Sequence, residues 1–206
     1  MKNILIFDPG LSDQAGHHFT SVTRISDEVM AHQHEGLIIG SKSADRLSMK
    51  LPIQNTLPFS LYLRKAWDKA TFLKRAIRMA LEFPDLRQFD AVFLPTGDQI
   101  QAMALALALQ KTPNTKLKVI TWLLFSPRYL HAPNQSASQA AECRYAFTDL
   151  VQQVNPHNIS VFCETKTLMD FYEEILPVSV QQQPSPSVVG KKRLTDGATK
   201  VMVVGC

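Results

Sequence analysis

Asn3-Ile-Leu-Ile-Phe7, closed by Asp8-Pro9-Gly10, sets a pattern that the rest of the chain repeats. A short apolar run that ends at turn residues is typical of a buried β-strand. Comparable runs follow at residues 37–39, 91–94, 117–125, 159–163 and 177–180. These runs are apolar along their length instead of alternating with polar residues, which indicates a parallel sheet buried on both faces.

The segments between these runs carry apolar residues at helical spacing. Helices are predicted over residues 18–33, 61–82, 99–110, 135–154 and 165–175. Residues 41–60 are predicted to be irregular because Pro52 and Pro58 interrupt them. The alternation of strands and helices predicts an α/β fold, a doubly wound parallel sheet in a Rossmann-like domain over residues 1–180.

The end of the chain has a different composition. Residues 181–198 are rich in Gln, Pro, Ser and basic residues, which is typical of an interdomain linker. Residues 199–206, Thr-Lys-Val-Met-Val-Val-Gly-Cys, predict a further buried strand. We expect this strand to be the first of a second, truncated domain.

Composition excludes several classes of protein. The chain has 206 residues, of which 45% are hydrophobic and 19% are charged, as in a globular protein. Its apolar runs fall short of the ~20 residues that span a bilayer, and its N-terminal run is too short for a secretory signal. The three cysteines show no metal-ligand spacing and are expected to be reduced thiols. We therefore expect a cytoplasmic protein without a cofactor or metal.

The net charge of +4 is concentrated in one segment. Residues 61–80 contain six Lys and Arg residues and only one acidic residue, an Asp. The positive charge is therefore confined to one segment and is not distributed over the surface as in many nucleic-acid-binding proteins. No nucleic-acid partner is expected.

The predicted helix over 61–82 has an apolar stripe at Leu63, Trp67, Ala70, Leu73, Ile77 and Leu81. Its basic side is either a solvated face or a surface that binds the inner face of an anionic membrane. The candidate membrane residues are Arg64, Lys65, Trp67, Lys69, Lys74, Arg75 and Arg78.

Ligands of doubly wound sheets bind at the carboxyl ends of the strands. The loop from Asp8 to His18 holds Gly16, His17 and His18 directly before a predicted helix. Backbone N–H groups at a helix N-terminus attract phosphate, and a histidine can donate to phosphate or act as a general base. The alternative is an ordinary turn with solvated histidines.

Three later loops offer further polar side chains at strand ends. Thr96 and Asp98 are suited to bind a polyol or to cap a helix. Arg128 is suited to hold a phosphate or carboxylate, or else is a surface residue. Glu164 precedes Thr165, a predicted helix cap.

Several of these stretches resemble GT-B glycosyltransferases of the bacterial family 4-like group. Ile4-Leu-Ile-Phe-Asp8 with Gly16-His17-His18-Phe19 resembles the opening of that family, and residues 90–95 resemble its strand before the acceptor-side loop. Residues 159–174, 176–178 and 201–205 resemble its late strand–helix unit, its hinge passage and the first strand of its second domain.

The resemblance implies two Rossmann-like domains that face a cleft, of which this chain is the acceptor-binding, N-terminal one. Transfer of a sugar from a nucleotide sugar to a carbohydrate or lipid-linked acceptor is implied. Gly16, His17 and His18 would approach the donor phosphates, with His17 as the catalytic candidate. The acceptor side would include Thr96, Asp98, Arg128 and Glu164.

Two further expectations follow from this resemblance. Family members often carry a histidine after the strand at 117–125, but Phe125-Ser126 stands there in this chain, so that role is unfilled. Without the donor half, residues 1–206 are expected to have little or no transferase activity. The alternative function is a non-catalytic Rossmann-like binding module that the basic helix recruits to a membrane surface or a partner.

Overall fold

The structure is a computed structural model that describes residues 1–14, 16–42, 44, 47–57, 72–124 and 136–184. The strands are β1 (Asn3–Phe7), β2 (Glu35–Ser41), β3 (Ile53–Leu57), β4 (Ala91–Leu94), β5 (Lys118–Trp122), β6 (Ile159–Cys163) and β7 (Val180–Gln182). The α-helices are α1 (Gly16–Ala31), α3 (Phe72–Ala80), α4 (Gln99–Lys111), α5 (Ser136–Gln153) and α6 (Lys166–Glu173). Short 3₁₀ turns at Leu86–Gln88 and Pro156–Asn158 precede β4 and β6.

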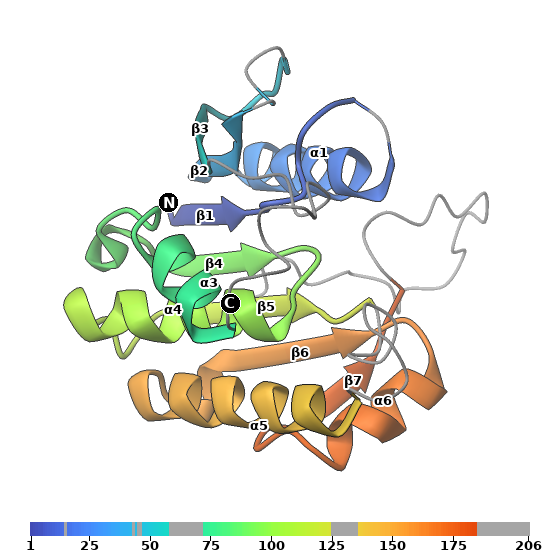
Figure 1. The fold of residues 1–206 in the computed structure, drawn as a ribbon. Coiled ribbons are helices and arrows are strands. Elements are labelled where there is room, and N and C mark those ends of the chain that lie inside the picture. Colours follow the sequence, from blue (N-terminus) through green and yellow to red (C-terminus); the bar gives the residue numbers. More distant parts are fainter. Residues whose placement is uncertain (15, 43, 45–46, 58–71, 125–135, 185–206) are drawn as a thin grey trace.

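The seven strands pair in the order β3-β2-β1-β4-β5-β6-β7, and every pair is parallel. The chain first adds β2 and β3 on one side of β1 and then crosses to add β4 to β7 on the other side (Figure 1). Because strand–helix–strand crossovers are right-handed, this change of direction moves the later helices to the opposite face. The predicted doubly wound parallel sheet is therefore confirmed.

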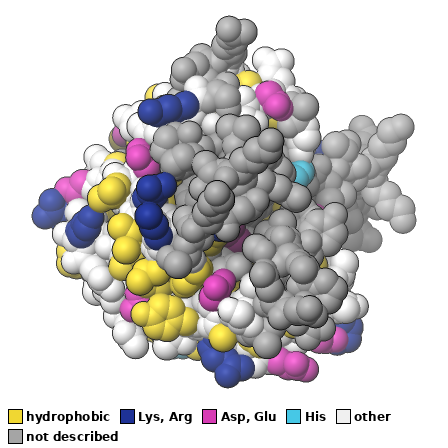
Figure 2. Space-filling model, viewed as in Figure 1, with side chains coloured by type: hydrophobic (Ala, Val, Ile, Leu, Met, Phe, Trp, Pro, Cys, Tyr) yellow, Lys and Arg dark blue, Asp and Glu magenta, His cyan; other side chains and the backbone are white. Residues whose placement is uncertain are grey.

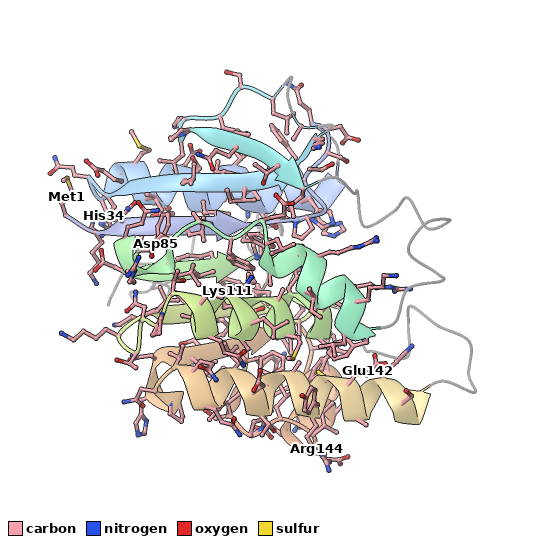
Figure 3. The ribbon with its side chains drawn as sticks, turned by 60° about the vertical axis from the view of Figure 1, so that its left-hand side comes forward. Met1, His34, Asp85, Lys111, Glu142 and Arg144 are labelled. Atoms are coloured by element: carbon pink, nitrogen blue, oxygen red, sulfur yellow. The ribbon has the colours of Figure 1, made fainter. Side chains whose placement is uncertain are left out.

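The sheet has a hydrophobic layer on each face. Leu5, Phe7, Val92 and Leu94 point to the layer under α3, α4, α5 and α6. Their neighbours in the strands, such as Ile4, Ile6 and Phe93, point to the layer under α1. Figure 3 shows α4 and α5 on the near side of the sheet and α1 on the far side. Burial on both faces explains why these strands are apolar at consecutive positions.

Both edge strands, β3 and β7, differ from the sequence prediction. β3 falls within residues 41–60, so the prediction of an irregular segment was wrong for Ile53–Leu57. The strand predicted over 177–180 is present but displaced: β7 runs from Val180 to Gln182, so it begins at the last predicted residue and extends two residues into the stretch predicted as a linker. Gln181 and Gln182 are exposed, because an edge strand needs only backbone hydrogen bonds to join the sheet. The stretch predicted as the start of a second domain, 199–206, lies outside the described residues.

In the described part of the helix predicted over 61–82, the apolar stripe was assigned to the wrong side. In α3 the buried residues are Ala76, Met79 and Ala80. Leu73 and Ile77 are 45% and 47% exposed, and Leu81, directly after the helix, is 64% exposed. Ala76, Met79 and Ala80 belong to the hydrophobic layer that α4 also joins, so the larger aliphatic residues face outward. Leu63, Trp67 and Ala70 lie outside the described residues.

Leu105 tests the layer beneath α4. Its side chain is fully buried, whereas Leu107 on the same helix is partly exposed. We expect Leu105→Ala to lower the free energy of unfolding by about 2–5 kcal/mol, since the cavity adds to the lost burial. Leu107→Ala is the matched control and should cost clearly less. Urea unfolding followed by circular dichroism measures both, and equal losses would contradict the described orientation of α4.

Candidate functional site

The carboxyl ends of β1 and β4 form the switch point of the sheet. Here the connection after β1 leads to one side of the sheet and the connection after β4 leads to the other. Such a point opens a crevice in which doubly wound proteins bind their ligands. Asp8 follows β1 directly, and Thr96 lies two residues after β4. Both side chains are buried at this edge.

Asp8 is the centre of a polar cluster that it forms with His18 and Thr96. Its side chain is completely buried. Oδ1 accepts hydrogen bonds from the backbone N–H of Gly10 at 2.9 Å and from the Thr96 hydroxyl at 3.2 Å. The Nδ1 atom of His18 lies 2.8 Å from Oδ1 and 3.0 Å from Oδ2. These partners stabilise a carboxylate that would be costly to bury alone.

Three local features bring His18 to Asp8. Asp8 continues the alternation of Ile4 and Ile6, so it points to the face that α1 covers. Gly16 opens α1 with φ of +78°, a left-handed conformation that favours glycine. The His18 ring lies against Gly10, where a Cβ atom would overlap it. The two glycines are therefore required by the path of the loop and by the close approach of the ring.

The Asp8 carboxylate fixes the chemistry of the His18 ring. A carboxylate accepts but does not donate, so the hydrogen bond places the proton of the neutral imidazole on Nδ1. The lone pair of the neutral ring then lies on Nε2. A histidine oriented in this way by a buried carboxylate is the arrangement that general-base catalysis uses to accept a proton from a hydroxyl group.

His17 and Glu164 lie beside the cluster. The rings of His17 and His18 have centroids 4.2 Å apart. Burial, and then the charge of His18, lower the pKa of His17, while the carboxylates of Asp8 and Glu164 act in the opposite direction. Glu164 follows β6, two strands away from β4, and is still near enough to affect that pKa. The structure thus brings four of the predicted site residues, His17, His18, Thr96 and Glu164, to one edge.

Asp8 itself was missed as a site residue by the sequence analysis, which treated it as the end of a strand. The available signal was its position, since an acidic residue that directly continues a buried strand must find hydrogen-bond donors. The sequence does not show which donor it finds, because Thr96 lies 88 residues further along the chain.

Asp98 lies on the other face of the sheet. Its carboxylate is the N-cap of α4 and accepts a hydrogen bond from the backbone N–H of Gln101 at 2.8 Å. Its charge acts on Cys143 and Tyr172, which belong to the layer under α3 to α6. The helix-cap interpretation of Asp98 is confirmed. Thr165 likewise caps α6 by accepting from the N–H of Leu168 at 3.2 Å.

The other predicted residues divide into two groups. Lys74, Arg75 and Arg78 lie on α3. The remaining candidates lie outside the described residues, and these are Arg64, Lys65, Trp67, Lys69 and Arg128.

The described residues contain neither a metal-binding cluster nor a membrane-spanning helix. No group of three or more His, Cys, Asp or Glu residues within them is arranged to hold a metal ion. None of the described helices combines the length and the apolar character that crossing a membrane requires.

The edge opposite the cluster holds a different set of residues. Figure 3 shows Met1, His34 and Asp85 near the amino ends of the strands. His34 therefore lies away from the Asp8–His18–Thr96 cluster.

Comparison with known proteins returns distant structural likenesses. No family model and no curated protein matches the sequence. An "alpha-glucosyltransferase in complex with UDP-glucose and DNA containing an abasic site" is 16% identical with a TM-score of 0.42, over 89% of this chain and 42% of that one. A "ugt transferase from Siraitia grosvenorii in complex with UDP" is 12% identical with a TM-score of 0.44, over 88% and 50% of the two chains.

A protein whose name does not mention a transferase has a similar TM-score. TubZ of the Clostridium botulinum phage c-st is 14% identical with a TM-score of 0.41, over 81% of this chain and 53% of that one. The chain spans about half the length of these structures or less. Likenesses at this level carry no inference about function, so the α/β class rests on the strand order and pairing described above.

Substitution of Asp8 tests the cluster. In Asp8→Asn the side chain can no longer accept from all three donors at once, since one of its two heteroatoms becomes a donor. We expect the free energy of unfolding to fall by about 1–3 kcal/mol. We also expect the His18 ring to lose its fixed tautomer, which ¹⁵N-detected imidazole NMR reports. Thr96→Val removes one donor only and should have the smaller effect on both measurements.

Asp98 predicts a pH dependence of stability. Burial raises the pKa of Asp98 to about 6 from an ordinary value of 3.8, against the opposing effects of the hydrogen bonds from Gln101 and Ile100 and of the Arg75 charge. The folded state therefore favours the protonated carboxyl, and the free energy of unfolding should fall as pH rises from about 4 to about 6. Asp98→Asn keeps a capping side chain and should remove this fall, with a gain of roughly 1–3 kcal/mol at pH 7.

The control for Asp98 is Asp13→Asn, which removes an exposed carboxyl from the loop before α1. Thermal unfolding between pH 4 and 7 compares the three proteins. A wild-type profile that Asp98→Asn leaves unchanged would show that this carboxyl does not titrate in that range.

Proposed function

We propose that this chain is the acceptor-binding, N-terminal part of a glycosyltransferase that takes its sugar from a nucleotide-sugar donor. The observation that carries the proposal is the buried Asp8–His18 pair at the switch point of the sheet. Sugar transfer to a hydroxyl group needs a base for the hydroxyl proton. His18, oriented by Asp8, supplies such a base at the edge where a doubly wound domain binds its ligand.

Each residue of the cluster has a role in this proposal. His18 accepts the acceptor proton through Nε2, and Asp8 stabilises the imidazolium that forms. Thr96 positions Asp8 and His18, since its hydroxyl lies 3.2 Å from both. The role of base thereby moves from His17, the candidate of the sequence analysis, to its neighbour.

His17 and Glu164 border the cluster and provide groups for the two substrates. A partly buried histidine beside the positive φ of Gly16 suits the approach of a donor phosphate to the start of α1. Glu164 and Arg128 remain proposed contacts for acceptor hydroxyl or phosphate groups. Asp98 is now proposed as a structural cap and not as an acceptor contact, because its carboxylate serves α4.

The resemblance of Ile4–Asp8 and Gly16–Phe19 to the opening of GT-B glycosyltransferases supports the same proposal from the sequence. Catalysis in that case needs a donor-binding domain that faces this edge, which would stabilise the leaving diphosphate electrostatically. Residues 1–206 are accordingly proposed to bind the acceptor and to transfer little or no sugar on their own.

Binding of saccharides tests this proposal directly. Two-dimensional ¹H–¹⁵N NMR of the ¹⁵N-labelled chain is recorded with a panel of free oligosaccharides and detergent-solubilised lipid-linked saccharides. We expect one class of saccharide to shift the amide signals of Gly10, His18 and Thr96. His18→Gln should weaken that binding by roughly tenfold, which corresponds to the loss of one hydrogen bond.

His157→Gln is the control, since this exposed histidine lies in the turn before β6, at the opposite edge of the sheet. Product formation from UDP-, GDP- and ADP-sugars with the bound saccharide is measured in parallel. A panel that leaves this edge unperturbed would contradict an acceptor site, and turnover by residues 1–206 well above a buffer blank would contradict the need for a donor-binding domain.

A further inference from the structure

The carboxyl edge of the sheet holds a buried hydrogen-bond donor that the described residues leave unpaired. Trp122 is the last residue of β5, and only 1% of its surface is exposed. Its indole Nε1–H is buried and has no hydrogen-bond partner among the described residues. A buried tryptophan usually finds an acceptor for this group, because an unpaired donor costs free energy. The exception at Trp122 therefore needs an explanation.

Packing alone does not explain an indole ring at this position. The Trp122 ring lies in the hydrophobic layer under α1 together with Phe93, and its centroid is 5.0 Å from that of Phe162. The other aromatic residues among the largest fully buried side chains are Phe7, Phe93 and Phe147. Phenylalanine fills apolar space without a polar atom, so the N–H group is the property that distinguishes Trp122.

Trp122 belongs to a row of residues along the carboxyl edge. The neighbouring strands β1, β4, β5 and β6 end at or just before Asp8, Thr96, Trp122 and Glu164, in that order. The Trp122 carbonyl accepts a hydrogen bond at 2.8 Å from the backbone N–H of Gly97, which ties β5 to the residue after Thr96. The Trp122 side chain also faces the same side of the sheet as Asp8, the side that α1 covers.

The chemistry of this row favours a neutral hydroxyl group as the partner of Trp122. An indole N–H donates and does not accept, so its partner must offer a lone pair. Asp8 and Glu164 lie on either side of Trp122 in the row, and two carboxylates would repel a phosphate. A hydroxyl group accepts from an indole and can also donate to a carboxylate. Adjacent strands lie about 5 Å apart, so a sugar of one or two rings spans the distance of about 10 Å between β1 and β5.

Solvent reaches the rim of this edge. The strand arrows of Figure 1 point to one side of the molecule, and Figure 2, in the same view, shows a histidine side chain at the surface on that side. His17 and Glu164, which border the cluster, are both partly exposed, whereas Trp122 is buried. A ligand at this edge thus meets His17 and Glu164 at its rim and Trp122 at its buried side.

We propose that Trp122 is a further binding residue for the acceptor saccharide, and that its indole N–H donates to a hydroxyl oxygen of the sugar whose reactive hydroxyl faces His18. This proposal rests on the proposed function, since it takes the acceptor to be a saccharide bound at the carboxyl edge. The sugar provides the acceptor atom that the described residues do not. The contact is selective, because a sugar without that hydroxyl leaves a buried donor unpaired.

The indole signals of the wild-type chain test the proposal. The chain has two tryptophans, so its ¹H–¹⁵N spectrum contains two indole signals, which through-bond experiments assign. The probe is the saccharide of the panel that shifts the amides of Gly10, His18 and Thr96. We expect it to move the Trp122 indole proton downfield and to slow the exchange of that proton with water, because a new hydrogen bond does both. Inorganic phosphate should do neither.

Analogues of that saccharide, each lacking one hydroxyl group, locate the contact. One analogue should bind the wild type about tenfold more weakly, and Trp122→Phe should weaken binding of the parent saccharide by a similar factor. In Trp122→Phe the same analogue should lose no further affinity, because the two changes remove one and the same hydrogen bond.

Phe93→Leu is the matched control for packing. Phe93 is fully buried in the same layer as Trp122, and its substitution shrinks an aromatic side chain without removing a donor. Phe93→Leu should bind the parent saccharide as the wild type does, and circular dichroism checks that both variants are folded. The analogue series on the wild type decides the question even where a variant does not fold.

Four results would overturn the proposal. A saccharide that shifts the amides of Gly10, His18 and Thr96 but leaves the Trp122 indole signal unchanged would remove Trp122 from the site and leave the proposed function intact. An indole shift caused by inorganic phosphate would assign the N–H to an anion. Equal weakening by Trp122→Phe and Phe93→Leu, with every analogue bound as tightly as the parent, would reduce Trp122 to a packing residue. A panel in which no saccharide perturbs this edge would contradict both the proposed function and the Trp122 contact.

Discussion

The reversal of strand order between β1 and β4 is the constraint on which the rest of this structure depends. β1 is central, with β2 on one side and β4 on the other, so its loop and that of β4 separate at the carboxyl edge. Right-handed crossovers then place α1 alone, among the described helices, on one face and the later helices on the other. The two hydrophobic layers and the meeting of Asp8 with Thr96 both follow from this one change of direction.

Asp8 connects that constraint to chemistry. A carboxylate at the end of the central strand is buried by the topology, and burial without partners would cost several kcal/mol. Donors from three segments meet it: the loop N–H of Gly10, the ring of His18 and the hydroxyl of Thr96. The same bonds that stabilise the carboxylate also orient the imidazole. Stability and the proposed proton transfer therefore use one set of contacts.

Buried polar groups and exposed aliphatic side chains mark two different parts of the structure. The Asp8–His18–Thr96 cluster is buried, polar and built from three separate segments. Leu73 and Ile77 on α3, and Leu81 directly after it, are aliphatic side chains that face solvent. α3 packs against the rest of the domain through Ala76, Met79 and Ala80 instead.

Local sequence was sufficient for the class of fold and for most elements. Apolar runs at Asn3–Phe7 and Ala91–Leu94 predicted buried strands, because burial on both faces favours apolar residues at consecutive positions, and the run at Ile159–Cys163 predicted a further strand. Capping residues such as Thr165 marked a helix start, because the cap bond joins neighbours in sequence. Position after a strand also pointed to His17, His18, Thr96 and Glu164 as residues of the carboxyl edge.

Other features came from contacts between distant segments. The edge strand β3 and the exact bounds of β7 depend on backbone bonds to the neighbouring strand, which composition does not record. Asp8 and Thr96 meet because β1 and β4 are adjacent, although 88 residues separate them. The buried side of α3 is set by its fit against α4, not by its own periodicity, which favoured Leu73 and Ile77 over Ala76 and Ala80. Periodicity predicts that a helix has two sides, and packing against a neighbour selects which side is buried.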